Sequence, residues 1–175
     1  HQAKSSYILS NEQQRPIGIF TERDLVKLLA SEQPTTDLTI GTVMTHGVLT
    51  LPASDITEPV AIYHFMKQQR VRHLPVVNEA GHLVGVITRQ SLRQALPPSS
   101  LLKLRLVKEI MEKQVICAPQ EASLLSLVQQ MAKHRVSCVV IETSNHHPVG
   151  IVTERDFVQC QISGINFSQT LAQTV

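Results

Sequence analysis

Tryptophan is absent from this 175-residue sequence, and aromatic residues make up only 3% of it. Proteins that bind single-stranded nucleic acid stack its bases on aromatic side chains. The 16 Lys and Arg residues are interspersed with 14 Asp and Glu residues, so no long basic block is present to follow a phosphate backbone. We therefore expect no nucleic-acid partner.

Long apolar runs are also missing. No stretch approaches the roughly 18 apolar residues that a membrane-spanning helix needs, and no charged-then-apolar leader resembles a secretion signal. We expect a cytoplasmic location and no membrane partner.

Cysteine is scarce, with Cys117, Cys138 and Cys160 as the three examples, and none of them forms a close C-x-x-C pair. Their apolar surroundings predict small buried side chains. The histidines show no i, i+4 pair of the kind that binds metal on a helix. No local pattern assembles a nucleophile and a base, so we expect no catalytic residue, no metal and no enzymatic activity.

The sequence does contain a repeat. Residues 16–24, 83–91 and 148–156 share the pattern apolar-Gly-apolar-apolar-Thr, followed by a polar segment. The repeat period is roughly 65 residues, which is typical of one supersecondary unit used several times.

The third copy shows the expected order of elements most clearly. A short strand at 115–118 ends at a proline, and Leu124, Leu127, Val128 and Met131 then have the i, i+3, i+4, i+7 spacing of an amphipathic helix. A hairpin of 138–142 with 149–153 and a helix at 154–160 follow. This β-α-β-β-α order predicts an α+β fold, in which repeats pair because one alone is too small to bury both helices.

Four segments follow from this pattern. Residues 1–30 form the back half of a first repeat, 38–96 a second repeat, 104–161 a third, and 165–175 the lead-in to a possible fourth, so the chain resembles a fragment of a longer protein. The Pro-Pro-Ser-Ser segment at 97–100 favours a boundary there. The first repeat would then pair with the second, although pairing of the second with the third remains open.

The repeated strand-Gly-x-x-Thr-x-x-Asp-helix element and the strand at 71–76 resemble those of CBS domains, named for cystathionine beta-synthase. The resemblance implies that two repeats form a Bateman module whose clefts bind AMP, ADP, ATP or, less readily here, S-adenosylmethionine. It also implies a homodimer and control of an attached or associated effector, with no required cofactor.

Thr21 with Asp24 and Thr153 with Asp156 fit the family's ligand-binding pattern, in which Thr contacts phosphate or ribose and Asp holds the ribose. The alternative interpretation is helix capping, because a threonine at the start of a helix and a carboxylate three residues later form a capping box. In the second repeat Ser91 stands where the aspartate would be, so at most two good sites are expected.

The remaining candidate residues are assigned by the same resemblance. Basic residues entering a strand would reach the phosphates, and the first strand of a repeat would contact the adenine. These candidates are Arg72 and His73 in the second repeat, and Ser137, Arg155, Ile116, Cys117 and Ala118 in the third. Solvated basic groups and ordinary core packing are the competing interpretations. Overall the sequence predicts a nucleotide-sensing regulatory module, and the alternative is a dimerisation or protein-interaction scaffold that binds no ligand.

Overall fold

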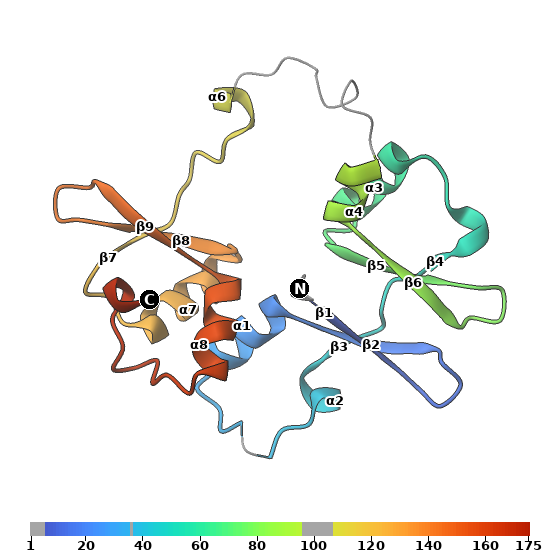
Figure 1. Cartoon of the computed structure of the whole chain (residues 1–175), viewed down its shortest axis with the longest axis horizontal. Coiled ribbons are helices and arrows are strands. Elements are labelled where there is room, and N and C mark those ends of the chain that lie inside the picture. Colours follow the sequence, from blue (N-terminus) through green and yellow to red (C-terminus); the bar gives the residue numbers. More distant parts are fainter. Residues whose placement is uncertain (1–5, 36, 96–106) are drawn as a thin grey trace. The chain divides into compact units, whose positions relative to one another are not determined.

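The structure is a computed structural model that describes residues 6–35, 37–95 and 107–175 (Figure 1). The expected linker at 97–100 and the predicted limits at residues 96 and 104 lie outside the described residues. The chain divides into two compact units. Unit 1 contains Phe20–Met44 with Glu112–Val175, and unit 2 contains Ser6–Ile19 with Thr45–Met111.

The second repeat forms a three-stranded sheet in unit 2, in the order β4-β5-β6. Strand β4 runs parallel to β5, and β5 runs antiparallel to β6, as the predicted β-α-β-β-α order requires. The elements are β4 (Leu51–Pro52), the 3-10 turn η1 (Ala53–Asp55), α3 (Pro59–Gln68), β5 (His73–Val77), β6 (Leu83–Thr88) and α4 (Arg89–Ala95). Helix α6 (Val107–Ile110) belongs to the third repeat by sequence but falls in unit 2. A buried cluster of Ile62, Met66, Leu74 and Leu92 joins the helices to the sheet.

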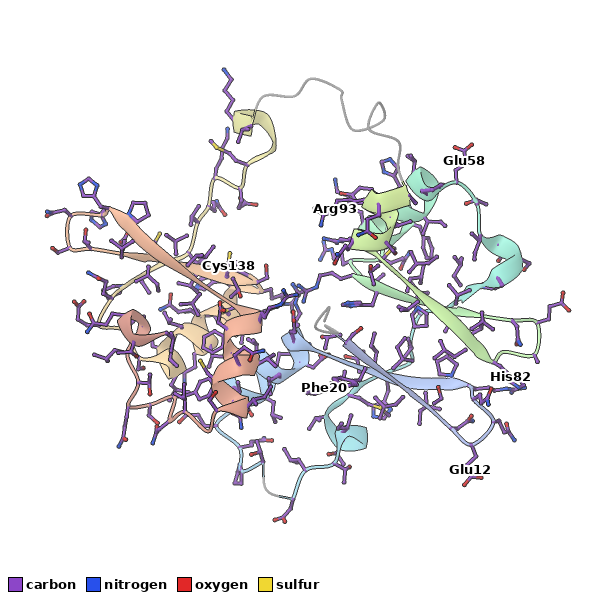
Figure 2. All side chains as sticks on the ribbon, viewed as in Figure 1. Glu12, Phe20, Glu58, His82, Arg93 and Cys138 are labelled. Carbon is purple, nitrogen blue, oxygen red and sulfur yellow. The ribbon has the colours of Figure 1, made fainter. Side chains whose placement is uncertain are left out.

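The sheet that contains the hairpin of the first repeat differs from the sheet of the second repeat, because its additional strand pairs antiparallel instead of parallel. Strands β1 (Ser6–Ser10) and β2 (Pro16–Thr21) form the expected hairpin, and the two-residue strand β3 (Thr45–His46) pairs antiparallel with β2. The turn of this hairpin contacts the second repeat, because Leu83 N–H donates to the Gln14 carbonyl at 3.0 Å. Glu12 and His82, labelled in Figure 2, mark the turns of the two hairpins.

The third repeat forms the sheet of unit 1 in the order β7-β8-β9, with the same directions as in the second repeat. Its elements are β7 (Cys117–Pro119), α7 (Leu124–His134), β8 (Cys138–Glu142), β9 (Pro148–Thr153) and α8 (Glu154–Ile162). The predicted lead-in segment 165–175 contains the 3-10 turn η2 (Ala172–Thr174), whose Ala172 joins the core of this repeat. The four predicted stripe residues of α7 are all buried, which confirms the amphipathic helix. Ser123 caps this helix by accepting a hydrogen bond from Ser126 N–H.

Helix α1 (Glu22–Ala30) belongs to the first repeat by sequence but packs in unit 1, beside α7 and α8 (Figure 1). Val26 on α1 is 2% exposed and joins the core of the third repeat, with Leu29 and Ala30 packed around it. At the end of the helix, Gln129 on α7 donates to Glu32 at 2.9 Å. The first repeat therefore contributes a hairpin to unit 2 and a helix to unit 1. A short lead-in helix, α2 (Ile40–Val43), follows.

Two expectations from the sequence were wrong in detail. The first strand of the third repeat, predicted at 115–118, is Cys117–Pro119, so it begins two residues later and includes the proline at which it ends. Strand β4 likewise ends with Pro52. Both strands are at sheet edges, where a residue without an N–H is tolerated. Of the three cysteines only Cys160 is buried, since Cys117 is exposed and Cys138 is half-buried.

Among the described residues, no helix has the length and apolar character needed to cross a membrane.

Candidate functional site

The Thr–Asp elements of the first and third repeats have the same geometry. Thr21 begins α1 and its Oγ1 donates to Asp24 Oδ2 at 2.7 Å, while its backbone N–H donates to the same oxygen at 3.0 Å. Thr153 begins α8 and makes the same two bonds to Asp156 Oδ2, at 2.7 Å and 2.8 Å. Both elements are complete capping boxes, so the capping interpretation correctly describes their local structure.

The second carboxylate oxygen distinguishes the two elements. Asp24 is 9% exposed, and its Oδ1 accepts from the Lys27 ammonium at 3.3 Å. Asp156 is half-buried, and within the described part of the chain its Oδ1 has no hydrogen bond or ion pair. Asp156 therefore has an acceptor available for a ligand hydroxyl, whereas the acceptors of Asp24 are occupied.

The element of the second repeat is neutral. Thr88 N–H donates to Ser91 Oγ at 2.9 Å, and Ser91 N–H donates back to Thr88 Oγ1 at 3.0 Å. Ser91 reproduces the capping role of the aspartate without its charge, which is the difference that the sequence indicated.

Helices α1 and α8 bring the two charged elements together through a pair of crossed ion pairs. Arg23 Nε lies 3.3 Å from Glu154 Oε1, and Arg155 Nε lies 3.7 Å from Glu22 Oε1. Sequence reasoning did not assign roles to Arg23, Glu22 or Glu154. The signal was present, because Thr-Glu-Arg-Asp occurs at both 21–24 and 153–156. The sequence does not show that the arginine of each Thr-Glu-Arg-Asp segment pairs with the glutamate of the other segment; the structure does.

Four more candidates of the third repeat lie on the sheet of unit 1, and one of them, Ser137, contacts the start of α8. The exposed Ser137 accepts from the Glu154 backbone N–H at 3.1 Å through its carbonyl, and it precedes Cys138 at the start of β8 (Figure 2). Ile116 is half-buried and its carbonyl accepts from Val140 N–H at 3.0 Å. Cys117 is exposed and Ala118 is 2% exposed, so side chains alternate along β7.

A cavity of about 230 Å³ lies at the other end of the same sheet. It is lined by residues of the β8–β9 hairpin and of the segment around η2, including Ile141, Gly150, Ala172 and Gln173, and by Gln120 after β7. None of the predicted site residues lines this cavity. Residues of β9 line this cavity, but their apolar sequence pattern is that of ordinary core residues, so the sequence did not indicate the cavity.

Arg72 and His73 lie in unit 2, at the start of β5, where His73 pairs with Thr88 across the sheet. They therefore accompany the neutral Thr88–Ser91 element. Burial lowers the pKa of His73 below its usual 6.5, and the positive charge of Arg72 lowers it further.

This pKa shift predicts a pH dependence of stability. Because the folded-state pKa of His73 is below the unfolded-state value, the unfolded chain binds the proton first as pH falls. Its contribution to stability is therefore complete above about pH 6.5 and is lost as pH falls toward the folded-state pKa. Urea unfolding at pH 7 and pH 5 should show a smaller loss of stability in His73→Gln than in the wild type, and an equal loss would contradict this assignment.

A family model described as the CBS domain matches residues 40–98 and 107–162. An uncharacterized protein from Methanopyrus kandleri is 35% identical over 94 residues, which are 53% of this chain and 46% of that protein. An inosine-5'-monophosphate dehydrogenase from Thermoplasma acidophilum is 37% identical over 87 residues, which are 48% of this chain and 16% of that enzyme. The chain thus spans less than half the length of these relatives.

A solved structure with the same fold is protein MJ1225 from Methanocaldococcus jannaschii, described as a putative archaeal homolog of g-AMPK. It has a TM-score of 0.80 at 18% sequence identity, and the alignment covers 98% of this chain and 69% of that chain. At this identity the likeness concerns the fold.

Proposed function

Because the chain belongs to the CBS domain family, we propose that it is a regulatory module that senses an adenine nucleotide of the AMP, ADP or ATP class. Binding takes place at the Thr–Asp elements and controls an attached or associated effector. The chain itself is not an enzyme, and the nucleotide is a signal, not a substrate.

The available carboxylate oxygen of Asp156 supports this proposal most directly. Its Oδ2 is held by Thr153 at 2.7 Å, which fixes the carboxylate at the start of α8, while Oδ1 has no bond among the described residues. Capping alone uses one oxygen. A fixed carboxylate with a second acceptor suits a ribose hydroxyl, and the adjacent helix start favours an anionic group such as phosphate.

We propose ligand contacts for the other candidate residues as well. Arg155 is 61% exposed, and we propose that it contacts the phosphate, as a guanidinium suits a phosphate. The backbone of Ile116 and Cys117, with Ala118 and Ser137, would border the adenine. We place Thr21 and Asp24 in a second, weaker site. Arg72 and His73 are proposed to contact phosphate in the second repeat.

Titration calorimetry on the wild type and on Thr153→Ala tests nucleotide sensing against simple capping. If Thr153 only caps α8, its loss lowers folding stability by about 0.5–2 kcal/mol, and the wild type has no nucleotide affinity to lose. We expect the wild type to bind AMP, ADP or ATP, and Thr153→Ala to lose affinity as well as stability. Absence of binding to all three and to S-adenosylmethionine would instead support the scaffold.

The proposed module is a homodimer located in the cytoplasm, without a membrane or nucleic-acid partner. Light scattering should give twice the chain mass of 19.4 kDa, with or without nucleotide. A single chain mass at high concentration would contradict the homodimer.

A further inference from the structure

The two crossed ion pairs of unit 1 are related by the repeat but differ in burial. In the Arg23–Glu154 pair, the carboxylate side chain is 4% exposed and the guanidinium 37%. In the Arg155–Glu22 pair, the corresponding values are 21% and 61%, and the distance is longer, 3.7 Å against 3.3 Å. A solvent-exposed pair contributes little to stability, whereas removing the cation beside a buried carboxylate is strongly destabilising.

The position of Glu154 determines where the Thr153–Asp156 element lies, because Glu154 is part of the same turn of the chain. It is the first residue of α8, directly after Thr153 and two residues before Asp156. Its backbone N–H donates to the Ser137 carbonyl at 3.1 Å, which joins the start of α8 to the start of β8. A displacement of Glu154 therefore moves both the capping threonine and the aspartate.

We propose that Arg23, a residue of the first repeat, is a positioning residue for the ligand site of the third repeat. Its guanidinium holds the buried Glu154 carboxylate, and Glu154 in turn holds the first turn of α8. The ligand part of this inference rests on the proposed function. The geometric part does not, since it concerns only the start of α8.

Amide hydrogen exchange measured by NMR tests the geometric part without any ligand. The informative amides are those of Thr153, bonded to Asp156, and Glu154, bonded to Ser137. In Arg23→Gln we expect both to exchange about tenfold faster or more, because local opening no longer breaks the ion pair of the buried Glu154 carboxylate. Glu22→Gln is the matched control, since it removes the longer and more exposed of the two pairs, and should change these rates less than about twofold. Unchanged rates in Arg23→Gln, or equal acceleration in Glu22→Gln, would overturn the proposal.

AMP affinity, measured by calorimetry below the unfolding temperatures of the variants, tests the ligand part. Glu22 is the partner of Arg155 in the proposed site, so the affinity control is Lys133→Gln, which removes an exposed cation on α7. We expect Arg23→Gln to weaken AMP binding about tenfold and Lys133→Gln to leave it within about twofold. If the wild type binds AMP and Arg23→Gln binds it equally well, Arg23 has no role in the site and the proposal fails. If exchange accelerates but the wild type binds no nucleotide, the proposed function fails while the positioning of α8 by Arg23 stands.

Arg23→Lys provides the second variant in case Arg23→Gln does not fold. Lysine keeps the positive charge beside Glu154 but loses the planar fork of donors. The amides of Thr153 and Glu154 should then exchange faster than in the wild type but more slowly than in a variant with an uncharged residue at position 23. Wild-type rates in Arg23→Lys would show that the charge alone holds Glu154. Arg23→Met removes the cation without adding a polar group and should accelerate exchange of both amides about tenfold or more. Wild-type rates and unchanged AMP affinity in a folded Arg23→Met would overturn the proposal.

Discussion

Replacing Phe157 with alanine should lower the free energy of unfolding of unit 1 by about 3–5 kcal/mol. Phe157 is fully buried on α8, and its ring stacks on Phe167 with centroids 5.8 Å apart. It belongs to the core that also contains the α7 stripe and Val26 of α1. Alanine would lose the buried ring surface and leave a cavity in this core.

Ile162→Ala is the matched control for Phe157→Ala. It lies on the same helix but is 76% exposed, so its removal should change stability by less than about 0.5 kcal/mol. Urea unfolding of both variants provides the measurement. Similar losses in the two variants would mean that Phe157 is not part of a packed core.

Replacing Asp156 with alanine should weaken nucleotide binding about ten- to a hundredfold, because a charge-assisted hydrogen bond contributes about 1.5–3 kcal/mol. Ser91→Ala should have little effect, since Ser91 has no carboxylate to offer a ribose. Asp156→Asn distinguishes charge from capping, because asparagine keeps an oxygen for Thr153 but loses the negative charge. Calorimetric titration of the three variants gives the ranking, and equal weakening by Ser91→Ala and Asp156→Ala would show it to be wrong.

The sequence predicted the repeat order and the helices well because these depend on local patterns. The stripe of α7 is a period of 3.6 residues, and Thr153 with Asp156 is a capping box readable from spacing alone. The limits of short strands were less accurate. Pro119 extends β7 because β8 offers it a parallel edge partner at Glu142, which lies too far along the chain for local patterns to indicate.

The contacts that join the repeats were outside the reach of sequence reasoning. Arg23 and Glu154 are 131 residues apart, and each has the local pattern of an ordinary polar residue in the first turn of a helix. Equally, nothing in the sequence of α1 indicated that Val26 would enter the core of the third repeat instead of its own. The exposure of Cys117 was missed because an apolar strand was taken as uniformly buried, although side chains alternate along it.

Thermal unfolding with and without AMP tests most directly whether the Thr153–Asp156 element binds a nucleotide in addition to capping a helix. A ligand that binds only the folded state adds about 2.7 kcal/mol of stability at a hundredfold excess over its Kd. We predict a clear rise in the melting temperature of the wild type and loss of most of that rise in Asp156→Ala. The same rise in both proteins would place the nucleotide elsewhere, and no rise with AMP, ADP, ATP or S-adenosylmethionine would contradict nucleotide sensing by this chain.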